Sequence, residues 1–359
     1  MEKNKKILCF IDSLAPGGAQ RQLVGLAVLL QSKGYSVEVL VYHDIPFYES
    51  YLLKNKVEIF KITGTKYKIS RFLKIYKFIR KCQPDILISY LDVPSIMACF
   101  IKILYNKNKL IVSDRNTTQH LSYLQKIKFF LFKNADYIVP NSRSQELFIK
   151  THYPKLSNKV CTITNFVDTS YFKSKYRAQS NLCKIVCVGR VAQQKNIFKF
   201  IDAIKLVSEK NFKVQVLWFG SQSEDYFKIC QNKIYELGLN HIFYFLKPTK
   251  RIVDEYNKAD VFCLPSLYEG FPNVVCEAMS CGLPILCSNV CDNSDLVEDG
   301  LNGFLFSPLS SDDISKKIIK YIELSDIQKQ QMSIESRRLA VAKFSSKRFI
   351  EKYLELIEN

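Results

Sequence analysis

The sequence predicts two α/β domains, each built around a parallel β-sheet, and three observations support this fold class. The chain of 359 residues is long enough for two ordinary domains. Short apolar runs alternate with helical patterns throughout, as in parallel sheets whose strands are joined by helices. A polar stretch without periodicity, residues 171–182, separates two such series and is typical of an interdomain linker.

The first series, over residues 1–170, opens with a strand and an amphipathic helix. In residues 19–33, apolar side chains from Leu23 to Leu30 recur at helical spacing, and Gly34 follows where a C-cap glycine is common. This pattern predicts a helix with one face on the sheet. The strands predicted in this series are Lys6–Ile11, Ser36–Val41, Val57–Ile59, Ile86–Tyr90, Leu110–Ser113, Tyr137–Pro140 and Val160–Ile163.

The second series, over residues 183–344, repeats the alternation of strands and helices. Residues 345–359 follow it as a separate amphipathic helix, which we expect to pack back on the N-terminal domain. The strands predicted in this series are Lys184–Val188, Val214–Phe219, Ile242–Phe245, Val261–Leu264, Pro284–Cys287 and Phe304–Phe306.

The net charge of +18 is unevenly distributed. Residues 1–170 carry 26 Lys and Arg against 12 Asp and Glu, whereas residues 171–359 carry 26 against 22. An excess concentrated in one half indicates a basic face with an anionic partner. An AT-rich coding sequence is an alternative source of lysines, but it does not account for the shortage of acids.

The apolar runs and the cysteines give expectations about compartment. The run Ile7–Ile11 is too short for a signal peptide, and Pro94–Tyr105 is too short for a membrane span. We therefore expect a cytoplasmic protein in a reducing compartment. The twelve cysteines lack the paired spacing of zinc ligands, so we expect free thiols in the core and no metal site.

Two glycines, Gly17 and Gly18, lie between the first strand and the first helix. Glycine allows a ligand to approach the backbone closely, and a helix N-terminus offers free N–H groups and the positive end of a dipole. The segment is either an anion-binding loop, for which a diphosphate is a suitable ligand, or a plain tight turn.

Two cations, Arg190 and Lys195, follow the first strand of the second domain. Strand ends of this kind face the crevice where doubly wound sheets bind ligands. A guanidinium fork and a point charge suit two phosphate groups. The alternative is a pair of solvated cations on a loop.

Two glutamates, Glu269 and Glu277, lie on a Gly- and Pro-containing loop and on the helix that follows it. Asn273 lies between them, where its side chain can cap the helix. The two carboxylates can then contact different parts of one elongated ligand. The alternative is a pair of solvated surface glutamates, which the apolar surroundings disfavour.

Ordered motifs along the chain resemble glycosyltransferase family 4. The block from Glu269 to Glu277 resembles the E-x7-E region of these retaining enzymes. The resemblance implies the GT-B fold, with two Rossmann-like, doubly wound parallel-sheet domains facing a central cleft. The other segments that carry it are Gly17–Ala19, Ala135–Ser142, Thr164–Asp168, Gly189–Asn196 and Val297–Phe304.

The resemblance also implies roles in donor binding and catalysis. Glu277 would hold the ribose hydroxyls of a nucleotide, and Glu269 would hold the donor sugar. Arg190 and Lys195 would neutralise the leaving diphosphate, and Gly18 would approach it from the other domain. Glu269, Arg190 and Lys195 are thus the catalytic candidates, without a metal or cofactor, since the sequence lacks a D-x-D motif. Further sugar contacts would come from Gly270, Phe271, Pro272 and Asn273.

The acceptor side departs from the family pattern. Many relatives place a histidine after the strand that corresponds to Leu110–Ser113, where this chain has Asp114 and Arg115. His120 is the nearest histidine, and a surface position is the alternative for it. Asp114, Arg115 and His120 are the candidates for contact with the acceptor.

These features predict a retaining hexosyl- or N-acetylhexosaminyltransferase that uses a nucleotide-sugar, most simply a UDP-sugar. The acceptor would be a glycan or a polyprenyl-diphosphate-linked oligosaccharide in bacterial surface polysaccharide or lipopolysaccharide synthesis. The alternatives are a GT-B epimerase or phosphorylase, and a basic nucleic-acid-binding protein. The sequence contains no nucleic-acid-binding motif, so we expect no nucleic acid as a partner.

Two basic, apolar segments predict a membrane partner. Arg71–Lys81 and Leu121–Lys133 interleave lysines or arginines with aromatic and aliphatic residues, as interfacial helices do. We expect them to bind an anionic surface on the inner face of the cytoplasmic membrane. Lys126, Lys128 and Lys133 are the cations chosen for this role. The alternative is that the apolar residues face the sheet and the lysines face water.

Overall fold

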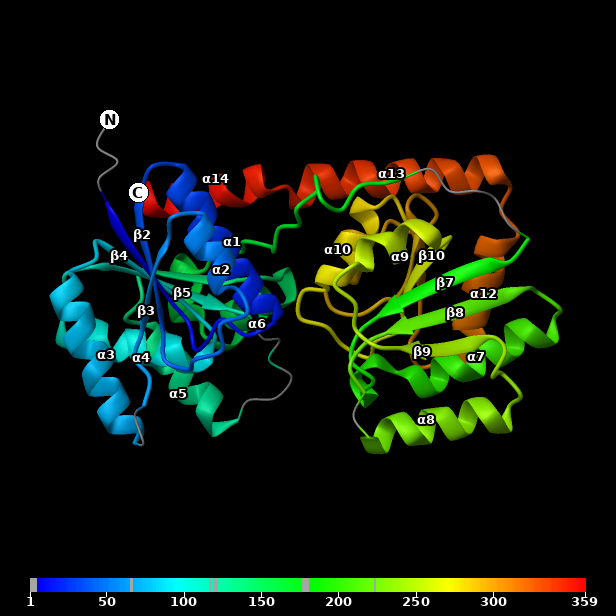
Figure 1. Cartoon of the computed structure of the whole chain (residues 1–359), viewed down its shortest axis with the longest axis horizontal. Helices are drawn as coiled ribbons and strands as arrows, with labels where there is room; N and C mark the ends of the chain where they lie inside the picture. Colours follow the sequence, from blue (N-terminus) through cyan, green and yellow to red (C-terminus); the bar gives the residue numbers. More distant parts are fainter. Residues whose placement is uncertain (1–4, 65–66, 116–117, 119–121, 176–180, 223) are drawn as a thin grey trace. The chain divides into compact units, whose positions relative to one another are not determined.

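The computed structural model describes residues 5–64, 67–115, 118, 122–175, 181–222 and 224–359. The chain forms two compact units, in each of which helices surround a β-sheet (Figure 1). Unit 1 comprises residues 1–166 and 346–359, and unit 2 comprises residues 167–345. The boundary between the first stretch of unit 1 and unit 2 therefore lies after residue 166, before the boundary at residue 170 that the sequence predicts.

Within the described residues of unit 1, six parallel strands form one sheet in the order β3-β2-β1-β4-β5-β6. This order reverses direction between β1 and β4, as in a doubly wound sheet. The strands are β1 Lys6–Phe10, β2 Ser36–Val41, β3 Glu58–Lys61, β4 Ile86–Tyr90, β5 Lys109–Asp114 and β6 Tyr137–Pro140. The α-helices are α1 Gly18–Ser32, α2 Glu49–Lys54, α3 Lys68–Cys82, α4 Asp92–Leu104, α5 Tyr123–Phe132, α6 Arg143–His152 and α14 Ser346–Glu358, and a 3₁₀ turn covers Pro154–Lys159.

Unit 2 repeats this topology in the part that is described, with six parallel strands in the order β12-β11-β10-β7-β8-β9. Here the reversal lies between β7 and β10. The strands are β7 Cys183–Val188, β8 Val214–Phe219, β9 Phe243–Leu246, β10 Val261–Leu264, β11 Ile285–Ser288 and β12 Gly303–Phe306. The helices are α7 Ile197–Glu209, α8 Glu224–Glu236, α9 Ile252–Lys258, α10 Asn273–Ser280, α11 Asn293–Leu296, α12 Ser311–Ile322 and α13 Asp326–Phe344, and a 3₁₀ turn covers Gln193–Lys195.

The predicted doubly wound parallel sheets are confirmed, and one predicted strand is wrong. Val160–Ile163 forms a single parallel bridge, from Val160 to Ile138, together with hydrogen bonds from Cys161 N to Ile138 O and from Ile163 N to Pro140 O. The segment runs along the edge of β6 without a continuous ladder. Val160 and Ile163 are buried in the core of unit 1. The hydropathy of this segment therefore resembled that of a strand.

The first helix follows its sequence pattern closely. Leu23, Leu26, Ala27 and Leu30 are buried in the core of unit 1. Gly34 follows the C-terminus with φ of +89°, a conformation that glycine adopts without a steric penalty. The helix therefore ends where the glycine allows the chain to turn into β2.

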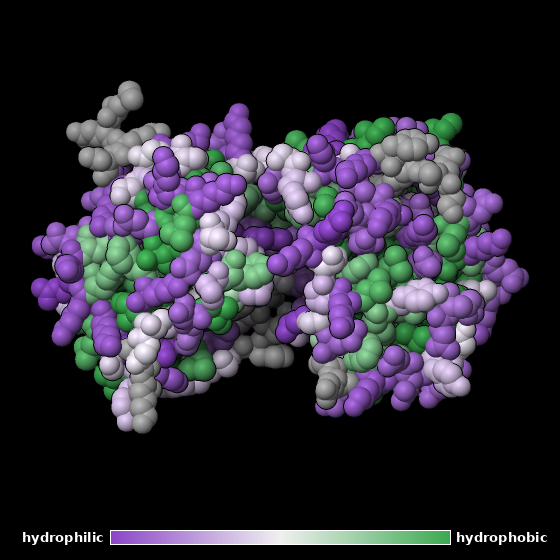
Figure 2. All heavy atoms as spheres, viewed as in Figure 1, coloured by the Kyte–Doolittle hydropathy of each residue, from purple (hydrophilic) through white to green (hydrophobic). Residues whose placement is uncertain are grey.

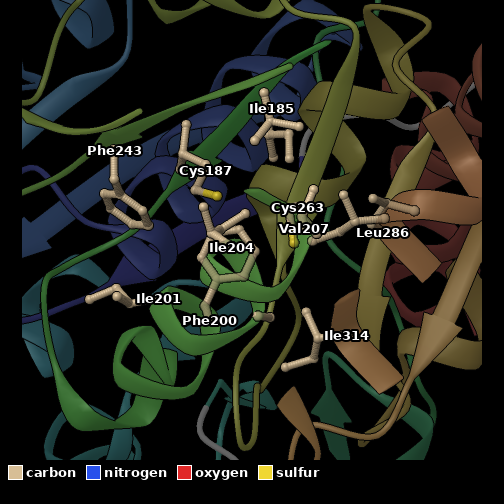
Figure 3. Packing of buried hydrophobic residues seen from close by; sticks show 14 of the residues in the cluster. Ile185, Cys187, Phe200, Ile201, Ile204, Val207, Phe243, Cys263, Leu286 and Ile314 are labelled. Carbon is tan, nitrogen blue, oxygen red and sulfur yellow. The ribbon is translucent and has the colours of Figure 1, made fainter. Parts of the chain in front are cut away.

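The core of unit 2 packs α7 against the sheet. Phe200, Ile201 and Ile204 of α7 meet Cys187 of β7 and Cys263 of β10 (Figure 3). All twelve cysteines are free thiols, and eight of them are buried, which confirms the expectation that they fill core positions.

The segment before β7 packs on unit 2 over its described residues. Val167 N donates to Phe344 O at 2.9 Å, and Phe172 is buried in the core. Arg337 donates to the carbonyl oxygens of Thr169 and Phe172. The start of the stretch predicted as a linker is therefore packed, while residues 176–180 lie outside the described part.

The C-terminal helix α14 belongs to unit 1. It buries Phe349, Ile350, Tyr353, Leu356 and Ile357 in the same core as β1 and α1. None of the helices in the described residues is both long and apolar enough to cross a membrane.

Candidate active site

The motif residues of unit 2 lie at two neighbouring strand ends. Arg190 and Lys195 follow β7, and Glu269 and Glu277 follow β10. β7 and β10 are paired in the sheet on either side of the point where the strand order reverses. This is the position where a doubly wound sheet leaves a crevice for a ligand.

Hydrogen bonds join the loops after β7 and β10. Leu267 N donates to Gln194 O at 2.8 Å, and Gln194 Nε2 donates to Tyr268 O at 2.9 Å. Asn196 Nδ2 donates to Pro265 O at 3.1 Å. Motifs about seventy residues apart in the sequence therefore form one structural element.

An ion pair lies at the centre of this element. Lys195 Nζ is 2.5 Å from Glu269 Oε1, and the side chains are 13% and 10% exposed. Solvent screens a pair with so little exposure less than it screens a surface pair. Arg190 is exposed at the same strand end. The site therefore combines a pairable cation, a carboxylate and an accessible guanidinium.

The helix α10 carries the second glutamate. Glu277 is 4% exposed, and the Tyr256 hydroxyl donates to Glu277 Oε2 at 3.4 Å. Asn273 is the first residue of this helix and not its N-cap, so the capping position expected for it is wrong. The preceding residue, Pro272, is the N-cap, and its fixed φ suits the start of a helix.

The loop before α10 is held against α13. The Phe271 ring lies 5.8 Å from the Phe344 ring in an edge-to-face arrangement, and Phe271 is buried. Gly270 precedes it in the same loop. These contacts fix the backbone from Gly270 to Asn273 on the rest of unit 2.

Two glycines bring the ends of β7 and β8 into close contact. A Cβ on Gly220 would lie 1.9 Å from Gly189 O, and a Cβ on Gly189 would lie 2.9 Å from Lys195 Cε. Trp218 Nε1 donates to the same Gly189 oxygen at 2.9 Å. The path of the loop that carries Arg190 therefore depends on Gly220, which the sequence motifs did not single out.

In unit 1, Gly18 is the first residue of α1 and Gly17 is its N-cap. The segment follows β1, which pairs with β4 where the strand order of unit 1 reverses. This is the position predicted for an anion-binding loop. A Cβ on Gly17 would lie 2.2 Å from Gln20 Oε1.

The acceptor candidates Asp114 and Arg115 lie at the carboxyl end of β5 and are buried. Asp114 accepts hydrogen bonds from Lys128 Nζ at 3.0 Å and from Gln145 Nε2 at 2.9 Å. Burial raises the pKa of Asp114, against the opposite effect of Lys128. Arg115 donates to other side chains of unit 1. His120, the third candidate, lies outside the described residues.

Lys128 does not face solvent as the sequence interpretation required. Its side chain is 1% exposed and pairs with Asp114 at 3.0 Å and Asp92 at 3.1 Å. Burial lowers the pKa of Lys128 and the two carboxylates raise it, and the net shift is upward. The expected role of Lys128 on a membrane-facing surface is therefore wrong, because Lys128 belongs to a buried network with Asp92 and Asp114. Lys126 and Lys133 on the same segment are exposed.

Comparisons with known families cover both units. The sequence model for "Glycosyl transferases group 1" matches residues 169–339, and the model for "Glycosyltransferase Family 4" matches residues 16–171. The chain belongs to the group 1 and family 4 glycosyltransferases.

One relative matches nearly the whole of this glycosyltransferase, and a second matches about half of it. An alpha-1,4-N-acetyl-D-galactosaminyltransferase of Campylobacter jejuni, named for a PP-undecaprenol-linked substrate, is 26% identical over 98% of this chain and 98% of its own. An alpha-1,3-galactosyltransferase of Escherichia coli, named for UDP-Gal and GlcNAc-diphosphoundecaprenol, is 29% identical over 52% of this chain and 50% of its own.

The fold of this glycosyltransferase is GT-B. The crystal structure of Anabaena HepE in complex with UDP and glucose superimposes with a TM-score of 0.85, at 20% identity, over 99% of this chain and 100% of that one. Among the described residues, no group of three or more His, Cys, Asp or Glu side chains is placed to hold a metal ion.

Sequence motifs did not identify every residue that shapes the site of this glycosyltransferase. Gly220, Tyr256 and Lys128 act on motif residues from outside the motifs. Lys128 directly precedes the apolar run Phe129–Phe132, and this position beside core residues was a usable signal for its burial. No local pattern identified the tyrosine.

Proposed function

We propose that this glycosyltransferase is a retaining hexosyl- or N-acetylhexosaminyltransferase that uses a UDP-sugar donor. Its acceptor is a glycan linked to a polyprenyl diphosphate, in the synthesis of a bacterial surface polysaccharide. The observation that carries the proposal is the arrangement of Arg190, Lys195 and Glu269 at the switch point of unit 2.

The charges of this element suit glycosyl transfer. As the bond to the donor sugar breaks, negative charge develops on the departing diphosphate and positive charge on the sugar. A preorganised guanidinium and ammonium, Arg190 and Lys195, lower the barrier by stabilising that negative charge. The Glu269 carboxylate lies within 2.5 Å of Lys195, at the place where the sugar would adjoin its diphosphate. We propose that these cations make a metal unnecessary.

The same geometry supports our proposals for the remaining donor contacts. Glu277 lies about one helical turn beyond the first residue of α10. It binds the ribose, remote from the reacting bond. The backbone from Gly270 to Asn273 binds the sugar, with Phe271 holding that loop in place.

The choice of UDP and of a lipid-linked acceptor rests on the relatives. The Escherichia coli relative is named for UDP-Gal, and the HepE structure holds UDP. The Campylobacter and Escherichia relatives are both named for undecaprenol-linked substrates. A donor with one UDP head group and an acceptor with a diphosphate lipid are the simplest substrates consistent with these names.

A lipid-linked acceptor requires access to a membrane, and unit 1 has a surface suited to it. On α3, Ile69 and Leu73 are 75% and 49% exposed beside exposed Lys74 and Lys77. We propose that this surface binds the anionic inner face of the cytoplasmic membrane.

The segment that contains α5 adds a second patch of the same composition. Tyr123, Leu124 and Phe130 are 77%, 72% and 63% exposed, and the exposed Lys126 and Lys133 lie beside them. Figure 2 shows hydrophobic side chains among hydrophilic ones at the surface of unit 1. Apolar burial combined with attraction to acidic headgroups supports reversible binding.

The donor is tested by thermal unfolding with a panel of UDP-, GDP- and ADP-sugars, because a ligand that binds the native state raises its stability. We expect UDP-sugars to raise the melting temperature most. Incubation with the stabilising donor and a polyprenyl-diphosphate-linked acceptor should then yield a product whose anomeric configuration, read by NMR, matches that of the donor. Inversion, or conversion of the donor without an acceptor, contradicts the proposal.

A further inference from the structure

Arg115 is a buried cation at the carboxyl edge of the unit 1 sheet, with 8% of its surface exposed. Nη1 donates to Asn165 Oδ1 at 2.6 Å, and Nη2 donates to the hydroxyls of Tyr90 at 2.5 Å and Tyr353 at 2.9 Å. The guanidinium carbon lies 4.1 Å from the centroid of the Tyr90 ring. These four residues form the Arg115 cluster.

The acceptors in the Arg115 cluster are all neutral. Arg115 Nη1 and Nη2 donate to an amide oxygen and two hydroxyls, and among the described residues Arg115 Nε is buried without a hydrogen-bond partner. Neutral acceptors replace only part of the hydration that a guanidinium loses on burial. An apolar side chain would serve packing alone at a lower cost, so the guanidinium is better explained by the geometry that it imposes.

That geometry joins three separate parts of the chain. Tyr90 is the last residue of β4, beside the point where the strand order of unit 1 reverses. Asn165 lies near the end of the first stretch of unit 1, and Tyr353 lies in α14. One side chain therefore ties the C-terminal helix to the edge of the sheet where ligands of doubly wound sheets bind.

Side chains of α5 and α6 also hold the carboxyl end of β5. Asp114 accepts from Lys128 and Gln145, and Gln145 Oε1 also accepts from Thr118 N at 2.9 Å. The carboxyl end of β5 is thus fixed on both sides by buried side chains. Substrate-binding segments that are fixed in this way lose little entropy when the substrate binds.

The contribution of α14 divides between packing and hydrogen bonding. Phe349, Ile350, Leu356 and Ile357 bury apolar surface in the core. Tyr353 is also fully buried. Its hydroxyl oxygen lies 2.7 Å from the hydroxyl oxygen of Tyr90, and it accepts a hydrogen bond from Arg115. Replacement of Tyr353 by phenylalanine removes this hydroxyl and keeps the ring.

We propose that Arg115 is a positioning residue and that α14, through Tyr353, is part of the scaffold that fixes the segment Ser113–Arg115 at the carboxyl end of β5. Arg115 acts on the acceptor through this segment and not by direct contact. The assignment of the segment to the acceptor rests on the proposed function, whereas the fixing of the segment by the Arg115 cluster does not.

The first experiment measures amide hydrogen exchange in the full-length protein, over peptides from residues 109–115. Arg115→Lys keeps the charge and loses the fork, and Tyr353→Phe loses one hydroxyl. We expect both to speed exchange in these peptides by about tenfold or more, because local opening is easier without the cluster. Tyr35→Phe is the matched control, since the Tyr35 hydroxyl donates to Glu358 Oε1 at 3.0 Å on the same helix.

Exchange at the wild-type rate in both variants overturns the proposal, as does an equal increase in Tyr35→Phe, which would indicate general loosening of α14. The second experiment measures kinetics with a UDP-sugar and a polyprenyl-diphosphate-linked acceptor. We expect the acceptor KM to rise about tenfold in Arg115→Lys while the Kd for UDP stays within about twofold.

The two experiments separate this inference from the proposed function. A wild-type protein that transfers no sugar to the lipid-linked acceptor contradicts the proposed function, and the exchange rates still decide whether the cluster fixes the segment. Faster exchange with an unchanged acceptor KM overturns the positioning role.

Discussion

Lys195 Nζ lies 2.5 Å from Glu269 Oε1, so the cation proposed for the diphosphate and the carboxylate proposed for the sugar are paired with each other. The pair joins the loop after β7 to the loop after β10 across the switch point of unit 2. In the proposed reaction, a donor that binds here exchanges this contact for contacts to its own phosphate and sugar. The electrostatic environment of the reacting bond is thus assembled before the donor arrives.

The two glutamates should differ in what they contribute. Glu277→Ala should weaken binding of UDP by about tenfold, since its proposed contact is remote from the reacting bond. Glu269→Ala should instead lower kcat and leave UDP affinity nearly unchanged. Isothermal titration with UDP and steady-state kinetics measure the two effects, and Glu236→Ala on the exposed end of α8 is the control. Equal losses of UDP affinity in both variants would contradict the assignment.

The two cations should act on turnover. Arg190→Ala and Lys195→Ala should each lower kcat by about a hundredfold, the scale typical of groups that stabilise charge in the transition state. Lys210→Ala, at the exposed C-cap of α7, should have no effect. Initial rates at saturating donor measure this. If both site variants turn over within a few-fold of wild type, the phosphates are bound elsewhere.

Chelation should leave the reaction unchanged. If Arg190 and Lys195 neutralise the leaving diphosphate, no divalent ion is needed for that charge. Transfer rates measured with excess EDTA, and after re-addition of Mg²⁺ or Mn²⁺, should agree within about twofold. A loss of activity in EDTA that Mn²⁺ restores would show that a metal takes part.

Two lysines on α5 should behave in opposite ways in unfolding experiments. Lys128→Met leaves the buried Asp114 without its cation and should cost about 3 kcal/mol of unfolding free energy. Lys126→Met, on the exposed side, should change it by less than about 0.5 kcal/mol. Urea denaturation with a single slope measures both. A mild effect of Lys128→Met would mean that the network contributes little.

Membrane binding should depend on the exposed lysines. The protein should co-sediment with liposomes that contain anionic lipid, and salt should release it because headgroup attraction is screened. The double variant of Lys126→Glu and Lys133→Glu should bind at least about tenfold more weakly, since each basic residue contributes about 1 kcal/mol. Lys205→Glu with Lys210→Glu, in unit 2, is the charge-matched control. Protein that stays in solution with anionic liposomes at low salt would rule out this surface.

The sequence predicted those features that repeat locally. Buried strands and the periodic helix from Leu23 to Leu30 depend on neighbouring residues, so their patterns identified them. The loop motifs at Arg190 and Glu269 could be predicted for the same reason, together with the resemblance. Pairing across the chain could not be predicted. Val160–Ile163 has a strand-like composition, but its edge position permits only a bridge.

Charged residues show the same limit. Lys128 lies in a run whose composition is typical of a membrane surface, yet Asp92 and Asp114, which are 36 and 14 residues away in sequence, lie close to it in space. Arg115 likewise finds Tyr353 some 238 residues away. A side chain's charge can be deduced from sequence, but whether it faces water or a buried partner depends on the tertiary fold.

The close contact between Gly220 and Gly189 has a consequence for mutagenesis. Even alanine at position 220 would place a methyl group 1.9 Å from the Gly189 oxygen, so the loop that carries Arg190 would have to shift. A saturation library screened for transfer would therefore report position 220 as intolerant, although Gly220 has no side chain and donates its N–H to Leu246 O at 3.0 Å. Interpreting such a map residue by residue would assign to Gly220 a chemical role that belongs to its neighbour.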